Sequence, residues 1–73
     1  MRIKQSILVS KKIAKSREEA KRIARKYADR IYTIRETENY YRIRQRPPED
    51  FKGGYRTQKV ANGIYIVWGN LKK

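Results

Sequence analysis

The spacing of apolar residues changes near Arg30, and this change constrains the fold more than any other feature. Residues 16–30 (SREEAKRIARKYADR) place apolar side chains at the spacing of one helix face. Ser16 and Glu19 match an S-x-x-E capping box, which predicts that a helix begins at Ser16. An earlier start near Ser10 is also compatible with the stripe. The stripe consists of Ala20, Ile23, Ala24, Tyr27 and Ala28.

After Arg30 apolar and polar residues alternate, which is typical of β-strands. Residues 31–36 (IYTIRE) and 40–46 (YYRIRQR) are predicted to form a hairpin. Pro47 and Pro48 end its second strand, because proline has no N–H group to donate to the ladder.

A second hairpin is predicted from residues 55–60 and 64–68, and Asn62 and Gly63 between them are a strong hairpin signal. The order of elements predicts an α+β fold, with one main helix packed on a three- to five-stranded, mainly antiparallel sheet built from two hairpins. A chain of this length forms one domain, so we expect a single small basic domain over residues 1–73.

The last predicted strand, residues 64–68 (IYIVW), carries no charge on either face. At a sheet edge such a strand would invite aggregation, so we expect something to cover it. One candidate is the N-terminal segment 2–9, whose partial alternation is compatible with a fifth strand. The other candidate is the same strand of a second copy. That homodimer would form through Ile64, Tyr65, Ile66, Val67 and Trp68.

The charge of the chain points to its partner. Twenty Lys and Arg against 7 Asp and Glu give a formal net charge of +13. Such an excess repels itself in the compact state and favours a polyanionic partner, either nucleic acid or an acidic membrane surface. The Ala-rich helix stripe is too shallow to bind a membrane. We therefore expect a nucleic-acid partner, DNA or RNA, and no membrane.

Residues 40–46 place a row of cations on one side of a strand. Tyr41 and Ile43 face one way and the residues between them face the other, because side chains alternate along a strand. If the helix covers the apolar side, the arginines stand on the open side with aromatic rings, as on a nucleic-acid platform. Neighbouring strands add cations according to their register. The predicted nucleic-acid-binding residues are Arg42, Arg44, Arg46, Tyr40, Arg35, Arg56 and Lys59.

An alternative interpretation of this row is structural. The arginines would pair across strands with Glu36 and Glu38, and the tyrosines would only pack. Since 7 acids cannot neutralise 20 bases, we favour binding. The helix cations form a secondary basic patch, for which a solvated helix face is the simpler interpretation. This patch consists of Lys21, Arg22, Arg25 and Lys26.

The composition removes most catalytic chemistry. Without Cys or His, the chain lacks the commonest metal ligands, the usual general base and the partner of a serine nucleophile. Gly53, Gly54 and Gly69 match no nucleotide-binding fingerprint. Glu49 and Asp50 are adjacent acids, but no spacing supports the metal site of a nuclease. We therefore expect no enzyme activity, no cofactor and no metal.

The second half of the chain contains the pattern R-x-R-Q-R-x-P, then F, Y-R-T, G and G-x-L-K. It falls on Arg42, Arg44, Gln45, Arg46, Pro48, Phe51, Tyr55, Arg56, Thr57, Gly63, Gly69, Leu71 and Lys72. This pattern resembles that of small uncharacterised proteins of archaea and phage-like elements. Because those proteins have no established activity, the resemblance implies no cofactor and no site residue.

We therefore predict a non-catalytic nucleic-acid-binding protein that contacts phosphates through a basic, aromatic-interleaved sheet face with low sequence specificity. The alternative is a small protein–protein adaptor of a viral or mobile element, with the apolar last strand as its interface. The apolar run at residues 7–9 is too short for a signal peptide or a membrane span, so we expect a cytoplasmic location. Abundant Lys, Arg, Glu, Ile and Tyr without Cys is typical of proteins from hot-growing organisms.

Overall fold

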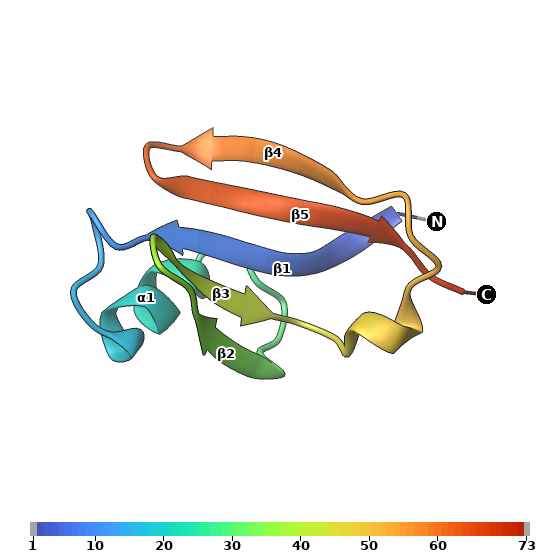
Figure 1. Cartoon of the computed structure of the whole chain (residues 1–73), viewed down its shortest axis with the longest axis horizontal. Helices are drawn as coiled ribbons and strands as arrows, with labels where there is room; N and C mark the ends of the chain where they lie inside the picture. Colours follow the sequence, from blue (N-terminus) through green and yellow to red (C-terminus); the bar gives the residue numbers. More distant parts are fainter. Residues whose placement is uncertain (1, 73) are drawn as a thin grey trace.

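The computed structural model describes residues 2–72, and this part of the chain forms one α-helix, one short 3-10 helix and five strands (Figure 1). In chain order the elements are β1 (Arg2–Ser10), α1 (Arg17–Ala24), β2 (Thr33–Glu36), β3 (Tyr40–Arg44), η1 (Pro48–Asp50), β4 (Arg56–Ala61) and β5 (Ile64–Asn70). Every strand pairing is antiparallel. The predicted α+β class, a helix on an antiparallel sheet with two hairpins, is confirmed.

The central strand of the sheet is β1. The strands lie in the order β2-β3-β1-β5-β4, so β1 joins the β2–β3 hairpin to the β4–β5 hairpin (Figure 1). On one side Leu8 of β1 lies opposite Arg42 of β3, and on the other side it lies opposite Tyr65 of β5. The N-terminal segment, which the sequence left open, is therefore the fifth strand and the middle of the sheet.

The apolar strand β5 is an internal strand. It pairs with β1 on one side and with β4 on the other, and Ile64, Ile66 and Val67 are buried within the chain. The N-terminal segment thus pairs with the edge of β5 that the second hairpin leaves open, and no backbone edge of β5 remains for a second copy. A homodimer through β5 stays a prediction, and it would have to use the half-buried side chains of Tyr65 and Trp68.

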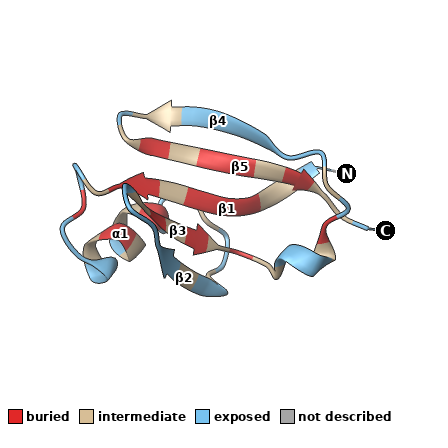
Figure 2. Cartoon of the chain, viewed as in Figure 1, coloured by how far each residue is buried: buried red, intermediate tan, exposed pale blue. Residues whose placement is uncertain are grey.

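The core lies between α1 and one face of the sheet (Figures 1 and 2). Ile7 occupies its centre, opposite Ile43 of β3 and Ile66 of β5, and its side chain is 0% exposed. Residues directly opposite each other point to the same face, so these three side chains form one apolar layer. Ala20 and Ala24 of α1 are buried against that layer. Their small side chains let the short helix lie close to the sheet.

The start of α1 agrees with the predicted capping box. The Ser16 hydroxyl accepts a hydrogen bond from the Glu19 N–H at 3.2 Å. The Glu19 carboxylate in turn accepts a hydrogen bond from the Lys15 N–H. The first bond satisfies one of the backbone donors that the first helical turn leaves free. The second differs from a full capping box, because Glu19 reaches the N–H of the residue before Ser16 rather than that of Ser16.

The predicted end of the helix, at Arg30, is wrong, because α1 ends at Ala24. Tyr27 donates its N–H to the Ala24 carbonyl, only three residues back, at 2.9 Å, and this bond tightens the chain out of the α-helix. Asp29 then donates its N–H to Oε1 of Gln45 at 2.7 Å. The segment after the helix is thus tied to the sheet by a tertiary contact that the local apolar spacing could not reveal.

The loop from Pro47 to Tyr55 folds over one end of the sheet face opposite α1. Phe51 in this loop is 5% exposed and forms an isolated bridge with Leu71. The ring rests on Gly69, where a Cβ atom would lie only 2.7 Å from Cδ1 of Phe51 and 3.0 Å from Cε1 of Tyr55. Only glycine at this position leaves room for the two rings that close this end of the face.

Candidate nucleic-acid interface

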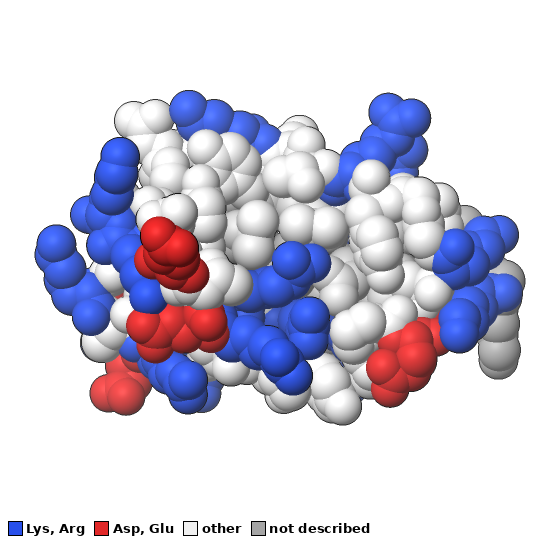
Figure 3. Space-filling model, in the orientation of Figure 1, with Lys and Arg blue, Asp and Glu red and all other residues white. Residues whose placement is uncertain are grey.

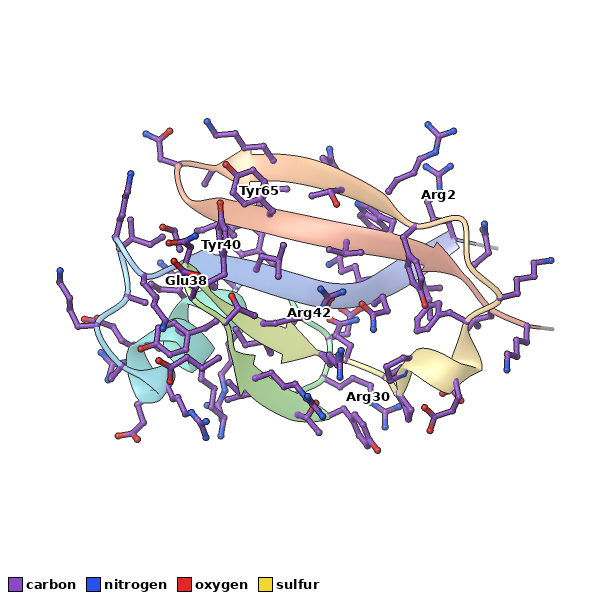
Figure 4. The ribbon with its side chains drawn as sticks, viewed as in Figure 1. Arg2, Arg30, Glu38, Tyr40, Arg42 and Tyr65 are labelled. Atoms are coloured by element: carbon purple, nitrogen blue, oxygen red, sulfur yellow. The ribbon has the colours of Figure 1, made fainter. Side chains whose placement is uncertain are left out.

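We call the sheet face opposite α1 the open face. On β3, Tyr41 and Ile43 are buried under α1, so the residues between them point to the open face. Figure 4 shows Tyr40, Arg42 and Tyr65 on the side of the sheet turned toward the viewer. Residues paired with these across the strands point the same way. The open face comprises Arg35, Tyr40, Arg42, Arg44, Ser6, Leu8, Tyr65, Val67, Thr57 and Lys59.

Arg42 and Arg44 are half-buried neighbours on the open face. Arg42 donates one hydrogen bond from Nη2 to Oε1 of Gln5 at 3.2 Å. The Nε atoms of both arginines are buried and have no hydrogen-bond partner among the residues described. Burial lowers the pKa of the Arg42 guanidinium, the charge of Arg44 lowers it further, and Tyr55 acts in the opposite direction. An anion placed on this pair would therefore stabilise it.

A third arginine adds to the repulsion between the positive charges of Arg42 and Arg44. Arg35 of the edge strand β2 lies directly opposite Arg42 and is exposed. On its other side Arg42 lies opposite Leu8 of β1, which supplies no charge. Like charges directly opposite each other destabilise a sheet by about 0.2–1 kcal/mol. The arrangement of these arginines is therefore one that packing alone would disfavour.

Gln5 accepts a hydrogen bond from Arg42, and it is not among the site residues predicted from the sequence. Its side chain is 1% exposed and lies at a bulge of β1, where the register with β5 shifts between Lys4 and Ser6. Oε1 of Gln5 accepts hydrogen bonds from Oγ of Ser6 at 2.5 Å and from Arg42. The signal that could have revealed it is the adjacent polar pair Gln5-Ser6, which breaks the alternation of apolar and polar residues along β1.

The structural alternative, in which Glu36 and Glu38 neutralise the arginine row, is not what the structure shows. Between residues 2 and 72 one ion pair forms, between Nζ of Lys11 and Oε2 of Glu36 at 2.6 Å. The hydrogen bond from Lys11, together with its charge, lowers the pKa of Glu36. Arg42 and Arg44 thus have no carboxylate within ion-pair distance among the residues described.

The remaining predicted residues divide between the two faces. Lys59 lies opposite Tyr65 and belongs to the open face. Arg56 lies opposite Trp68, whose ring packs against the core, so Arg56 points to the side of α1 and is not part of the row. Arg46 follows the end of β3 and lines a shallow hollow with Glu49, Asp50, Leu71 and Lys72. The structure thus brings together five of the seven predicted residues and leaves Arg46 and Arg56 outside.

The secondary basic patch lies on the other side of the sheet, because it belongs to α1 and the turn after it. Arg22 and Lys26 are exposed there. A groove between α1 and residues 28–34 is lined by Arg17, Lys21, Arg25 and Arg30. These cations are separated from the open face by the sheet, so the two basic surfaces cannot act as one site on a single short ligand.

Aromatic rings lie at both ends of the open face. Tyr40 and Tyr65 meet edge to face, with ring centroids 5.9 Å apart and an angle of 80° between the ring planes. At the other end the Phe51 and Tyr55 rings are 5.9 Å apart and cover Gly69. We call the surface formed by Arg35, Arg42 and Arg44 the basic strip. The half-buried arginines lie between the two aromatic pairs, so the basic strip is short.

Two further features of interest are a metal site and a membrane-spanning helix. In the part of the chain that the structure describes, no group of three or more acidic, His or Cys side chains is placed to hold a metal ion. Among the same residues, no helix is long and apolar enough to cross a membrane.

Comparison with known proteins adds no family to these observations. No family model, no curated protein and no solved structure matches the chain. The resemblance to small archaeal and phage-like proteins therefore stays a resemblance of sequence pattern, and any function has to be inferred from the open face itself.

Proposed function

We propose that this chain is a non-catalytic nucleic-acid-binding protein that contacts phosphates through the open face with low sequence specificity. The observation that carries the proposal is the arginine group. Arg42 and Arg44 are half-buried, their Nε atoms lack partners, and Arg35 faces Arg42 across the strands. No carboxylate within residues 2–72 pairs with any of the three.

The energetics of this group favour an anionic ligand. Side chains two residues apart on one face of a strand are separated by about 6–7 Å, so the charges of Arg42 and Arg44 repel each other. The guanidinium group also offers a planar fork of donors that matches a phosphate, and its Nε atom is one of those donors. A nucleic-acid backbone would accept hydrogen bonds from the exposed parts of the two guanidinium groups and offset the repulsion at the same time. The buried Nε atoms would reach a phosphate only if the side chains turned outward.

The distribution of charge on the open face fits a backbone contact. Figure 3 shows one group of Lys and Arg side chains near the middle of this face and further Lys and Arg side chains around its rim. Acidic side chains lie to the left of the central group and toward the lower right, and much of the remaining surface is uncharged. Phosphate contacts of this kind carry no base information, which is the reason for the low sequence specificity. We expect neither a metal ion nor a cofactor to be needed.

The adaptor alternative rested on an apolar strand exposed at the sheet edge. β5 is paired on both sides, and the edges β2 and β4 are mostly polar and exposed. The feature that motivated an adaptor is therefore missing, and the nucleic-acid proposal is the better supported of the two.

The proposal is tested by the salt dependence of binding. We expect fluorescence anisotropy with labelled single-stranded DNA, duplex DNA and RNA to give a linear fall of log K with log salt. If Arg35, Arg42, Arg44 and Lys59 each neutralise one phosphate, the slope is about −2.8 for a single strand and about −3.6 for a duplex. Oligonucleotides of shuffled sequence should bind alike. Absence of binding to all three ligands at roughly 50 mM salt would refute the proposal.

Arg35→Glu separates binding from stability. The new carboxylate would lie opposite Arg42, so we expect the free energy of unfolding to rise by about 0.2–1 kcal/mol. Affinity for nucleic acid should fall by about threefold or more, because one phosphate contact becomes a repulsion. Chemical denaturation and anisotropy on the same sample measure the two changes.

The matched control is Lys59→Glu, which makes the same charge change on the other edge strand. Lys59 lies opposite Tyr65 rather than a cation, so its replacement should leave stability within about 0.5 kcal/mol while weakening binding. The interpretation fails if Arg35→Glu destabilises the fold or binds as tightly as the wild-type chain.

A further inference from the structure

A hollow at one end of the open face collects cations that the arginine row does not include. It lies where three connections meet: the segment after β1, the β2–β3 turn and the β4–β5 turn. We call it the lysine hollow. Its lining includes Ser10, Lys11, Lys12, Lys15, Tyr40 and Tyr65.

The walls of the lysine hollow are fixed by backbone hydrogen bonds. Ser10 donates its N–H to the Gly63 carbonyl at 2.7 Å, and Lys11 donates its N–H to the Asn39 carbonyl at 3.0 Å. Gly63 has a φ of 77°, a conformation that glycine adopts without strain, and a Cβ atom there would lie 3.1 Å from Cβ of Ser10. The three connections therefore hold one shape without a ligand, which lowers the cost of binding.

Two of the three lysines that line the hollow are not paired with a carboxylate among the residues described. Lys11 is engaged by Glu36, and Glu19 bonds the backbone N–H of Lys15 rather than its ammonium group. Lys12 and Lys15 are exposed and have no carboxylate within ion-pair distance among the residues described. Lysine ammonium groups bind phosphate as point charges, so the hollow can hold one phosphate group.

The rings of Tyr40 and Tyr65, at the rim of the lysine hollow, stand nearly perpendicular to each other. In Figure 4 the ring of Tyr65 is seen nearly face on and that of Tyr40 nearly edge on, in agreement with their 80° angle. The Tyr65 ring thus lies along the sheet and exposes a flat surface, and Tyr40 stands beside it. A nucleotide base stacked on such a ring contributes about 1–3 kcal/mol to binding. A duplex cannot use this surface, because its base faces are already stacked inside the helix.

Acidic side chains lie on either side of the arginine row. In Figure 4 Glu38 lies beside Tyr40, and at the opposite end Glu49 and Asp50 lie by Arg46. The basic strip between them is short. A ligand that follows it from the arginine row to the lysine hollow passes close to Glu38 whether it is single-stranded or duplex, so the preference for a single strand rests on the Tyr65 surface.

We propose that the open face binds single-stranded nucleic acid in preference to duplex, with one base stacked on Tyr65 beside Tyr40 and the adjoining phosphate held by Lys12 and Lys15 in the lysine hollow. This inference rests on the proposed function and names its substrate class. It adds Tyr65, Lys12 and Lys15 to the predicted binding residues.

The test compares Tyr65→Leu with Tyr32→Leu on a labelled single strand and a duplex of equal length. Tyr32 is 51% exposed and lies away from the open face, so it serves as the aromatic control. We expect Tyr65→Leu to weaken single-strand binding by about tenfold at every salt concentration, without changing the salt slope or the duplex affinity. Tyr65→Phe keeps the ring and should bind the single strand as the wild-type chain does. Circular dichroism establishes that each variant is folded.

A second pair of variants tests the phosphate. Lys12→Gln/Lys15→Gln should make the single-strand salt slope shallower by about 0.7 for each phosphate that the variant no longer neutralises. Lys21→Gln/Lys26→Gln removes equal charge on the helix side and should leave the slope close to that of the wild-type chain. This readout does not depend on whether Tyr65→Leu folds.

The outcomes distinguish this inference from the proposed function. Equal binding by Tyr65→Leu and Tyr32→Leu, or tighter binding of duplex than of single strand by the wild-type chain, overturns the single-strand inference. The proposed function survives that result, since duplex binding through Arg42 and Arg44 would remain. Failure of the wild-type chain to bind any nucleic acid overturns both.

Discussion

Replacing Arg42 and Arg44 together by glutamate is expected to weaken nucleic-acid binding by at least about tenfold at roughly 100 mM salt. The two guanidinium groups lie side by side at the centre of the open face with unpartnered Nε atoms. The change removes two phosphate-binding cations and places two negative charges under the backbone. The salt slope should become shallower by about 1.4 for a single strand or 1.8 for a duplex. Anisotropy titrations at several salt concentrations measure both quantities.

The matched control is Lys21→Glu/Arg25→Glu, which makes the same change in net charge on the helix side of the sheet. If the open face is the site, the control should lose only the affinity due to overall charge, about threefold or less, and keep most of the slope. Equal losses in the two double variants would mean that binding follows net charge alone. The open face would then have no special part in it.

Ile7→Ala is expected to have the largest effect on stability. Ile7 is fully buried in the central strand between Ile43 and Ile66, so truncation leaves a cavity with no side chain able to fill it. Such truncations cost about 2–5 kcal/mol, against a total of about 4–11 kcal/mol for a domain of 73 residues. We expect the midpoint of thermal unfolding to fall by roughly 10–30 °C, as measured by circular dichroism.

Leu8→Ala provides the comparison one residue along the same strand. Leu8 is half-buried and points to the open face, so its truncation removes less buried surface and should cost about 1 kcal/mol. If both truncations cost the same, the two faces of the sheet would not differ as core and open face. The assignment of Arg42 to a ligand-facing surface would then lose its structural basis.

The local elements of this fold could be predicted because their signals are local. The capping box at Ser16 marked the helix start, and the Asn-Gly pair marked the β4–β5 turn. The end of α1 could not be predicted from the apolar stripe, because the stripe continues to Ala28, whereas the segment after Ala24 is held by a bond from the Asp29 N–H to Gln45 of a distant segment. The central place of β1 is likewise a matter of long-range pairing, which apolar alternation does not encode.

For the candidate site, too, the features that depend on local spacing could be predicted and those that depend on long-range pairing could not. Alternation within β3 is enough to place Tyr40, Arg42 and Arg44 on one face, and the structure puts them there. Arg56 required the register of β4 against β5, which includes a bulge between Lys59 and Ala61, and its side is opposite to the predicted one. The lysine hollow required three connections to meet in space, and no spacing in the sequence indicates that meeting.

The central position of β1 also has a consequence for how the chain folds. Ile7 finds its partners Ile43 and Ile66 only across long intervening segments, so the core is built from non-local contacts. Chains with such pairings pay the entropy of loop closure before the contacts stabilise them, and they fold in milliseconds to seconds rather than microseconds. In the folded chain β3 and β5 cover the two edges of β1, so any state that lacks one of these pairings leaves an edge of β1 open to other chains. A polyanion that offsets the mutual repulsion of the cations would favour the compact state, in which both edges of β1 are paired.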